Sequence, residues 1–230
     1  MRILLRRNSI LVLGFVVSAV CVVLFVALGN DGPGKEGAVK TQLPSPAIDG
    51  GMSVEKALFL RRSIRTYAPN SLSLGEISQI LWAAQGITGE EKFRTAPSAG
   101  ALYPITLYIA AEKVETLQAG IYRYSPGKHE ITKLKDGMFL KQLAEAALGQ
   151  QCIAECAAAL IIAANYDRLR FRYRDRSERY AHIEAGHVSQ NVYLQAIALR
   201  VGTVNIGAFH DKEVAKIIGL DTQEYPLCIM

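Results

Sequence analysis

The sequence predicts a single globular domain that contains both helices and strands. Its 230 residues are half hydrophobic, which is ample for one substantial core. Ser73 and Glu76 have the spacing of a capping box, and apolar residues follow at helical spacing as far as Gly86, so an amphipathic helix is expected there. By contrast, residues 105–111 and 157–165 are short apolar runs typical of buried strands.

The other elements follow in order along the chain. Ser53 is a suitable N-cap for a short helix, and Ala57, Leu58, Leu60 and Ile64 supply its apolar face. Two strands joined by a Ser-Pro-Gly-Lys turn are expected at 120–124 and 129–134, helices at 138–148, 178–201 and 212–218, and further strands at 203–206 and 227–230.

Residues 1–29 are predicted to be an N-terminal membrane anchor or signal segment. An uncharged run from Ile10 to Leu28 follows three arginines, and its length just spans the roughly 30 Å of hydrocarbon in a bilayer. A cleaved signal peptide is the competing interpretation, although its apolar core is usually about 7 to 15 residues long. We favour an uncleaved anchor. The positive-inside rule then predicts a membrane-anchored domain on the extracytoplasmic side, whereas cleavage predicts an exported protein.

Residues 30–51 are expected to form a flexible linker, because they are rich in Gly, Pro and small polar residues and show no apolar periodicity. The folded domain is then expected over residues 52–230. Its charge is nearly balanced: Arg2, Arg6 and Arg7 are three of the 26 basic residues, which leaves 23 against 21 acidic residues. So small a net charge argues against nucleic acid as a partner.

A basic cluster at the end of the first predicted helix is a candidate phosphate site. Arg61, Arg62 and Arg65 flank Ser63 and Ile64. Such a cluster is often only a solvated face, but Ile64 is an apolar anchor that would fix it against the core. Arginine forks suit the phosphate of a ligand such as flavin mononucleotide (FMN), which Arg61 and Arg62 would face, with Ser63 nearby. Arg65 would then lie beside the pyrimidine edge of the ring, where a cation favours the reduced state.

Two further segments offer backbone rather than side chains. Residues 97–100, Pro-Ser-Ala-Gly, form either an ordinary turn before a strand or a platform on which small residues let a flat ring lie close to the chain. The segment around Ile206 and Gly207 is either the end of a buried strand or a place where the Gly207 amide meets the reactive ring nitrogen of a flavin.

Together these segments resemble the nitroreductase superfamily of FMN flavoproteins, and most closely its SagB-type branch, the dehydrogenases related to thiazole- and oxazole-forming peptide oxidases. The resemblance runs from about residue 43 to residue 230. Its landmarks are the runs 61–65, 81–89, 96–104, 179–191, 207–209 and 224–227. It implies an α+β fold, with a central and mostly antiparallel sheet flanked by helices, and FMN bound at a homodimer interface. The FMN-binding residues that it implies are Arg61, Arg62, Ser63, Arg65, Pro97, Ser98, Ala99, Gly100, Ile206 and Gly207.

The resemblance implies an FMN-dependent oxidoreductase with ping-pong turnover. NADH or NADPH is the expected electron donor, and hydride passes through the flavin to or from a small organic substrate. The flavin carries the chemistry, so no catalytic acid or base is assigned. Such chains usually continue into a short Gly-containing tail that helps hold the phosphate, whereas this sequence stops at Met230, so weaker FMN binding or a fragment is expected. The alternative function is a flavin-free, membrane-tethered binding or scaffold protein on the same fold.

The remaining histidine, cysteine and arginine patterns are given structural rather than functional interpretations. His182, Glu184 and His187 lack the i, i+4 pair of a zinc helix, so no metal is expected, and Glu184 with His187 is interpreted as a helix-face pair near the dimer contact. Cys152 and Cys156 are interpreted as buried thiols. The arginine-rich run 168–179 is usually a solvated edge or loop, and a lid that steers an anionic donor or substrate is the alternative.

Overall fold

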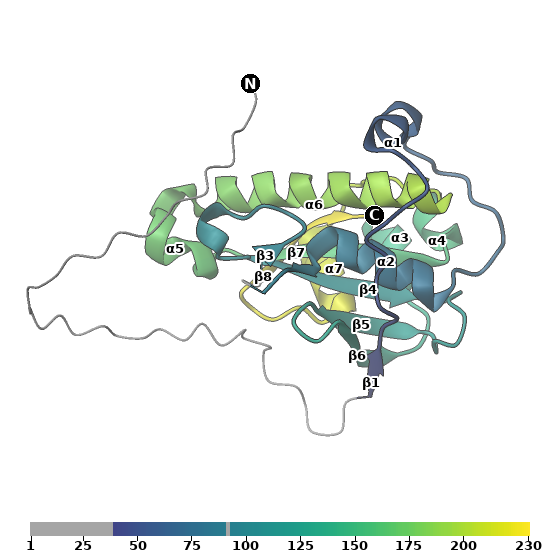
Figure 1. The fold of residues 1–230 in the computed structure, drawn as a ribbon. Coiled ribbons are helices and arrows are strands. Elements are labelled where there is room, and N and C mark those ends of the chain that lie inside the picture. Colours follow the sequence, from purple (N-terminus) through teal and green to yellow (C-terminus); the bar gives the residue numbers. More distant parts are fainter. Residues whose placement is uncertain (1–38, 91–92) are drawn as a thin grey trace, which may run out of the picture. The chain divides into compact units, whose positions relative to one another are not determined.

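A six-stranded sheet forms the centre of the structure, and every neighbouring pair of its strands is antiparallel (Figure 1). The computed structural model describes residues 39–90 and 93–230. The sheet has the order β1-β6-β5-β4-β7-β8, with β1 (Lys40–Gln42), β4 (Ile105–Ala111), β5 (Gly120–Ser125), β6 (Glu130–Asp136), β7 (Ala158–Asn165) and β8 (Glu224–Ile229). A separate hairpin pairs β2 (Ile87–Thr88) with β3 (Phe93–Arg94). The expected antiparallel sheet is confirmed.

Helices cover both faces of this sheet. They are α1 (Val54–Leu60), α2 (Leu74–Gln85), α3 (Leu140–Ala146), α4 (Gln151–Glu155), α5 (Asp167–Tyr173), α6 (Ser177–Leu199) and α7 (Asp211–Ile218). Side chains of the central strand β4 alternate between two hydrophobic clusters. Leu107 and Ile109 pack with residues of α2 and α6, whereas Tyr108 and Ala110 pack with residues of α3, α4 and α7.

The two predicted helix starts are confirmed. The Ser73 side chain accepts the Glu76 backbone N–H at 3.2 Å, and the Glu76 carboxylate accepts the Ser73 N–H at 2.7 Å, which completes the capping box of α2. Ser53 accepts the Lys56 N–H at 3.2 Å and so caps α1. Helix α2 ends at Gln85, whose side chain is fully buried next to α6.

Part of the predicted linker belongs to the folded domain. Within residues 30–51, strand β1 pairs with β6, and Leu43 is buried in the core. Residues 30–38 lie outside the described part of the chain. The sequence pattern did not reveal β1 because an edge strand that faces solvent carries polar side chains and shows no apolar alternation.

Two other segments differ from the predicted elements. Residues 203–206 do not form a regular strand, and only Ile206 pairs there, with Ile229 of β8. The arginine-rich run contains helix α5 and a 3-10 turn, Arg174–Arg176, in place of an edge or loop. Leu169 of α5 is fully buried and Phe171 is fully exposed, as expected of a helix that places one face on the core.

The predicted localisation needs correction. No helix within residues 39–90 and 93–230 is long and apolar enough to cross a bilayer. The prediction of a membrane-anchored or exported protein therefore does not stand. The apolar run from Ile10 to Leu28, on which that prediction depended, lies outside the described residues.

Candidate functional site

Tyr193 of α6 joins two of the three segments that the sequence singled out. Its hydroxyl lies 3.1 Å from Ser63 Oγ and accepts the Asn205 backbone N–H at 2.7 Å. Its ring lies under the Arg61 guanidinium, 5.1 Å from the ring centre, in a cation–π contact. The basic cluster and the 203–207 segment therefore meet on one buried tyrosine. Tyr193 does not stand out in the sequence, because a tyrosine on an apolar helix face has the same pattern as a residue of the hydrophobic core.

The three arginines of the cluster have different surroundings. Arg61 is half-buried on Tyr193, whereas the Arg62 guanidinium donates to the carbonyls of Phe59 at 3.1 Å and Arg61 at 2.7 Å. Arg62 thus binds carbonyl groups at the C-terminal end of the preceding helix, α1. Arg65 is exposed. Arg61 and Arg65 are consequently the two guanidinium groups that remain available to a ligand in this arrangement.

The anchor between these arginines is fixed by close packing. The Ile64 backbone N–H donates to the Thr203 carbonyl at 2.9 Å. A Cβ atom on Gly202 would lie 3.0 Å from Ile64 Cγ2 and 3.3 Å from Tyr67 Cδ1, so the close approach requires glycine there. Ile206 is buried, whereas Gly207 is exposed and a Cβ atom on it would meet nothing within 4 Å. The Gly207 backbone is therefore open to a ligand.

The Pro97, Ser98, Ala99 and Gly100 segment forms a tight turn at the other end of α6. Gly100 has φ of 61°, in the left-handed region that glycine tolerates. Ser98 Oγ accepts the Tyr103 backbone N–H at 2.9 Å and fixes the turn from inside. Pro97 and Gly100 are exposed, and Ser98 and Ala99 are half-buried. A Cβ atom on Gly100 would lie 2.8 Å from the Tyr173 hydroxyl and 2.9 Å from an Arg172 guanidinium nitrogen, so side chains of α5 lie against that end of the turn. The surface that the turn offers a ligand is therefore that of Pro97, Ser98 and Ala99.

A buried polar network underlies this turn. Glu184 of α6 is 1% exposed, and its Oε1 accepts from the Gln85 amide at 3.5 Å. Arg94 donates to Gln85 Oε1 at 2.7 Å and lies 4.4 Å from the centre of the Tyr103 ring. Glu184 Oε2 and Arg94 Nε have no hydrogen-bond partner within the described residues. The network is therefore only partly satisfied.

Glu184 and His187, interpreted as a helix-face pair, differ in their surroundings, because Glu184 is buried and His187 is exposed. Burial raises the pKa of Glu184 to about 7, against the opposing influence of the nearby Ser98 hydroxyl, the Gln85 amide and two guanidinium groups. His182 lies instead beside the Tyr166 hydroxyl, at 3.2 Å. Among residues 39–90 and 93–230, no three His, Cys, Asp or Glu side chains are arranged to hold a metal.

The two candidate segments lie on opposite flanks of α6. Glu184 and Tyr193 are nine positions apart, which at 100° per residue turns their side chains about half a circle away from each other. The same spacing separates them by about 13 Å along the helix axis. Figure 1 shows α5, beside the turn, near one end of α6 and α1, which leads to the arginines, near the other. One chain therefore does not bring both segments to one point.

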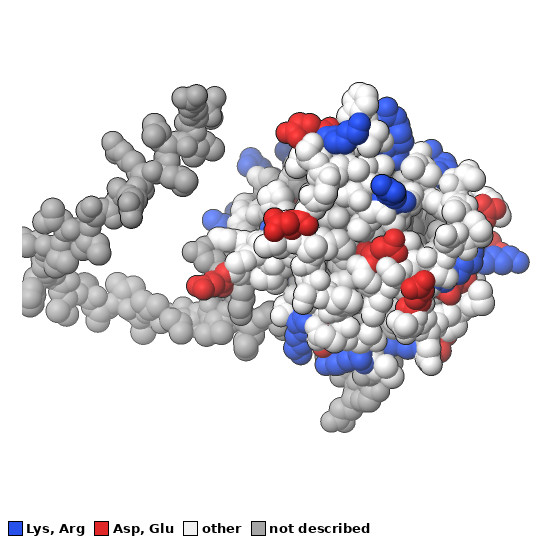
Figure 2. All heavy atoms as spheres, turned by 45° about the vertical axis from the view of Figure 1, so that its right-hand side comes forward, with Lys and Arg blue, Asp and Glu red and all other residues white. Residues whose placement is uncertain are grey.

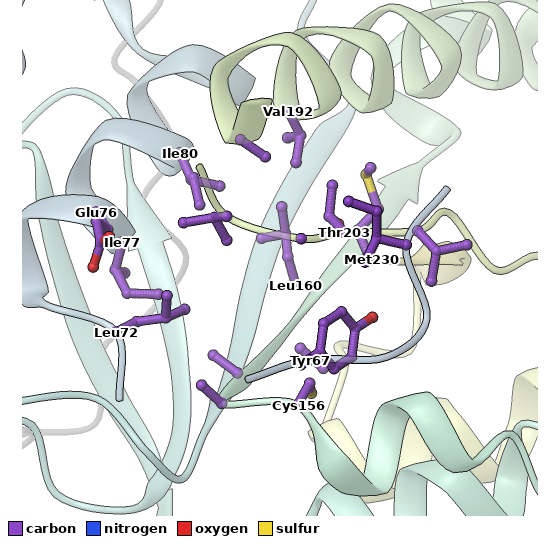
Figure 3. A pocket seen from close by; sticks show the side chains of 18 of the residues that line it. Tyr67, Leu72, Glu76, Ile77, Ile80, Cys156, Leu160, Val192, Thr203 and Met230 are labelled. Atoms are coloured by element: carbon purple, nitrogen blue, oxygen red, sulfur yellow. The ribbon is translucent and has the colours of Figure 1, made fainter. Parts of the chain in front are cut away.

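A cavity of about 500 Å³ adjoins the arginine side (Figure 3). Apolar side chains of α2, α6 and the sheet dominate its lining, and Tyr67, Glu76 and Thr203 add polar groups. Ile64 and Ile206 also line it. Burial raises the pKa of the Cys156 thiol, at its edge, to about 12 and keeps it protonated at neutral pH.

The face seen in Figure 2 has no patch of charge of a single sign among the described residues. On the face seen in Figure 2, basic and acidic side chains of the described residues are interspersed. The described cysteines, Cys152, Cys156 and Cys228, are free thiols, and Cys152 and Cys228 are buried.

Comparison with known proteins gives the family. Residues 59–230 match the nitroreductase family. A nitroreductase-family protein of Methanocaldococcus jannaschii is 46% identical over 179 residues, which are 78% of this chain and 89% of that protein. A Ralstonia eutropha structure described as a nitroreductase has a TM-score of 0.73 at 27% identity, covering 83% of this chain and 86% of that one.

A second structural relative comes from the peptide-modifying branch. It is a chain of the Escherichia coli microcin synthetase McbBCD complex with truncated pro-MccB17 bound. Its TM-score is 0.65 at 25% identity, and the match covers 94% of this chain and 82% of that one. The helix-flanked antiparallel sheet, the family match and these relatives agree, and the chain belongs to the nitroreductase family.

Proposed function

We propose that this protein is an FMN-dependent oxidoreductase that transfers hydride to or from a small organic substrate. Its family consists generally of oxidoreductases that bind a flavin and use NADH or NADPH. The observation that carries the proposal is that Arg61, Ser63 and the Asn205 backbone meet on Tyr193, two residues before the open backbone of Gly207. The Arg61 guanidinium and the Ser63 hydroxyl are side by side on Tyr193, and they are the kinds of donor that a phosphate and a ribityl chain need.

The residues present fit such a group. A flavin, when bound, supplies the hydride chemistry. Arg61 would hold its phosphate, with Ser63 beside it, and Arg65 would lie by the pyrimidine edge of its ring. Residues 97–99 of the turn would cover one face of the ring, because their small side chains let a flat ring approach, whereas Arg172 and Tyr173 lie against Gly100. The unpaired oxygen of Glu184 beneath that turn indicates a site built for more than packing.

The site would be completed by a second copy of the chain. The arginine cluster and the turn lie on opposite flanks of α6, so a ligand that contacts both takes one from each of two copies. Helix α1 supports a homodimer, because Val54, Leu58 and Phe59 are 64%, 51% and 71% exposed. Exposed apolar side chains on a short helix are removed from water when a partner covers them, which stabilises the association.

Mixing two variants tests the shared site. Arg61→Ala removes the phosphate contact and Ala99→Leu places a bulky side chain on the platform, so each variant alone should lose FMN binding. After unfolding and refolding of an equal mixture, half of the dimers are mixed, and each mixed dimer has one site with both native segments. About a quarter of all sites should then bind FMN.

The first measurement is the absorption spectrum of the full chain with FMN, followed anaerobically with NADH, NADPH or dithionite. Flavin bands that co-purify and bleach support the proposal. A folded protein that takes up no FMN would refute it and favour a flavin-free binding protein. The control for Arg61→Ala is Lys141→Ala, which removes an exposed cation of α3. A monomeric mass at full FMN occupancy would refute the shared site alone.

A further inference from the structure

Positive charge is concentrated in one short segment that the proposed FMN site does not use. Residues 167–179 contain six arginines against three acidic residues, Asp167, Asp175 and Glu178. Elsewhere in residues 8–230 there remain 17 of the 23 basic residues and 18 of the 21 acidic residues. The net positive charge of the folded domain therefore comes from this segment, which includes α5 and the first turn of α6.

Most of these arginines are exposed and have no acidic partner. Arg170 forms an ion pair with Asp167 at 2.8 Å. Phe171, next to it, is fully exposed. Four other exposed arginines form no ion pair with any residue that the structure describes, and with Arg170 and Phe171 they make up what we call the arginine surface: Arg172, Arg174, Arg176 and Arg179. Guanidinium groups beside an exposed aromatic ring suit a ligand that carries phosphates and a flat base.

The arginine surface is fixed beside the 97–100 turn. Leu169 of α5 is fully buried, and the Arg168 guanidinium donates to the Tyr103 carbonyl at 2.9 Å. A Cβ atom on Gly100 would lie 2.9 Å from Arg172 Nη1 and 3.4 Å from Arg172 Cδ, so this guanidinium lies directly on the turn. Figure 1 shows α5 near one end of α6, and Figure 2 brings the other side of the molecule forward. The positive charge therefore lies next to the proposed position of the flavin ring.

We propose that the arginine surface binds the phosphate groups of the dinucleotide electron donor, and that it selects NADPH over NADH. Both donors carry a diphosphate and a second flat base, and NADPH adds a phosphate monoester with a charge of about −1.5 to −2 at neutral pH. The contact of Arg172 with the turn favours this occupant over an anionic membrane, which needs no ring site beside it. This inference rests on the proposed function.

The arginines take no part in the redox chemistry under this proposal. One hydride leaves the dihydronicotinamide of the donor for the oxidised flavin, so the donor loses two electrons and the flavin gains them. The phosphate groups stay intact, and the donor leaves as the oxidised nicotinamide dinucleotide. The arginine surface changes only how often and how tightly an anionic donor is bound.

Anaerobic stopped-flow reduction of the FMN-loaded full chain tests this selection with donors of different charge. The donors are NADPH, NADH and N-benzyl-1,4-dihydronicotinamide, which has the same reacting ring and no phosphate. Arg170→Gln together with Arg172→Gln should lower the second-order rate constant about tenfold for NADPH, less for NADH and little for the uncharged donor. Raising the ionic strength from about 10 mM to about 0.1 M should also slow the wild type with NADPH, because the screening length falls from about 30 Å to about 10 Å.

The matched control removes the same charge from the other face of the sheet. Lys141 of α3 and Lys212 of α7 are exposed, and these helices pack on the cluster opposite to that of Leu169. Lys141→Gln together with Lys212→Gln should keep the wild-type rate constants for all three donors. Circular dichroism and the flavin absorbance confirm that each variant is folded and loaded.

The possible failures are distinguishable. If both double variants lose the same rate, or if the arginine variant keeps the wild-type ratio of NADPH to the uncharged donor, this inference is refuted while the proposed function stands. Binding to phosphatidylglycerol vesicles that is lost in the arginine variant, with unchanged donor rates, would assign the surface to a lipid contact and refute it as well. A folded wild type that takes up no FMN would overturn both this inference and the proposed function.

Discussion

Replacing Tyr193 by phenylalanine should weaken the native fold modestly and measurably. The substitution removes one hydroxyl group, which accepts the Asn205 N–H at 2.7 Å and lies 3.1 Å from Ser63 Oγ. It keeps the aromatic ring, so the cation–π contact with Arg61 at 5.1 Å survives. The change therefore isolates the hydrogen bonds that tie the basic cluster to the 203–207 segment.

The expected loss follows from those two bonds. An N–H that loses a neutral acceptor costs about 1 kcal/mol net, and Asn205 is exposed enough for water to replace part of it. The contact with the exposed Ser63 is weaker, about 0.5 kcal/mol. The free energy of unfolding should thus fall by about 1 to 1.5 kcal/mol.

Urea unfolding of the two proteins measures this difference. The midpoint should fall with no change in the slope, because the same surface is exposed on unfolding. Tyr225→Phe is the matched control, since Tyr225 is 47% exposed and its ring stacks on Tyr166. The role given to Tyr193 is refuted if Tyr193→Phe is as stable as the control. It is also refuted if the double-mutant cycle of Ser63→Ala and Tyr193→Phe shows no coupling free energy and the exchange rate of the Asn205 amide is unchanged in Tyr193→Phe.

Three further outcomes are expected. Because the pKa of Glu184 is raised in the fold, its contribution to stability is present at low pH and falls as pH rises from about 4.5 to about 7, by up to about 3 kcal/mol. Urea titrations at several pH values should show this fall, and Glu184→Gln should remove it. Gly202→Ala should cost about 1 to 3 kcal/mol by thermal unfolding, because the new Cβ lies 3.0 Å from Ile64 Cγ2. Ser73→Ala should cost about 1 kcal/mol in the same assay, because it breaks the capping box with Glu76.

The elements that the sequence predicted well are those specified by local chemistry. The capping box of Ser73 and the apolar run of β4 need no distant partner to be recognised, and both form at the expected residues. Strand β1 and helix α5 were missed for the opposite reason. Strand β1 exists because β6 offers it a free edge, and α5 is anchored by Leu169, one buried residue among charged neighbours. Neither tertiary contact leaves a periodic pattern in the sequence.

The candidate site was predicted in part. The three segments are visible in sequence because arginine clusters and small-residue turns are unusual in composition. The residues that support these segments cannot be recognised in the sequence, because Tyr193 and Glu184 are both buried residues of a long, largely apolar helix. The sequence does not distinguish a buried glutamate from a solvated one, and only the fold brings Gln85 to Glu184 and Arg94 to Gln85.

The geometry of α6 relates the arginine cluster to the 97–100 turn. Its buried surface is wide enough for Tyr193 to lie at one edge and Glu184 at the other, so the helix holds an arginine cluster on one flank and a platform on the opposite flank. In the proposed homodimer, a ligand with a phosphate at one end and a flat ring at the other would contact the flank of one copy and the opposite flank of a second. Loss of dimerisation should therefore lower FMN affinity even in a variant whose ten candidate contact residues are all native. A monomer that binds FMN as tightly as the dimer would show instead that one flank suffices.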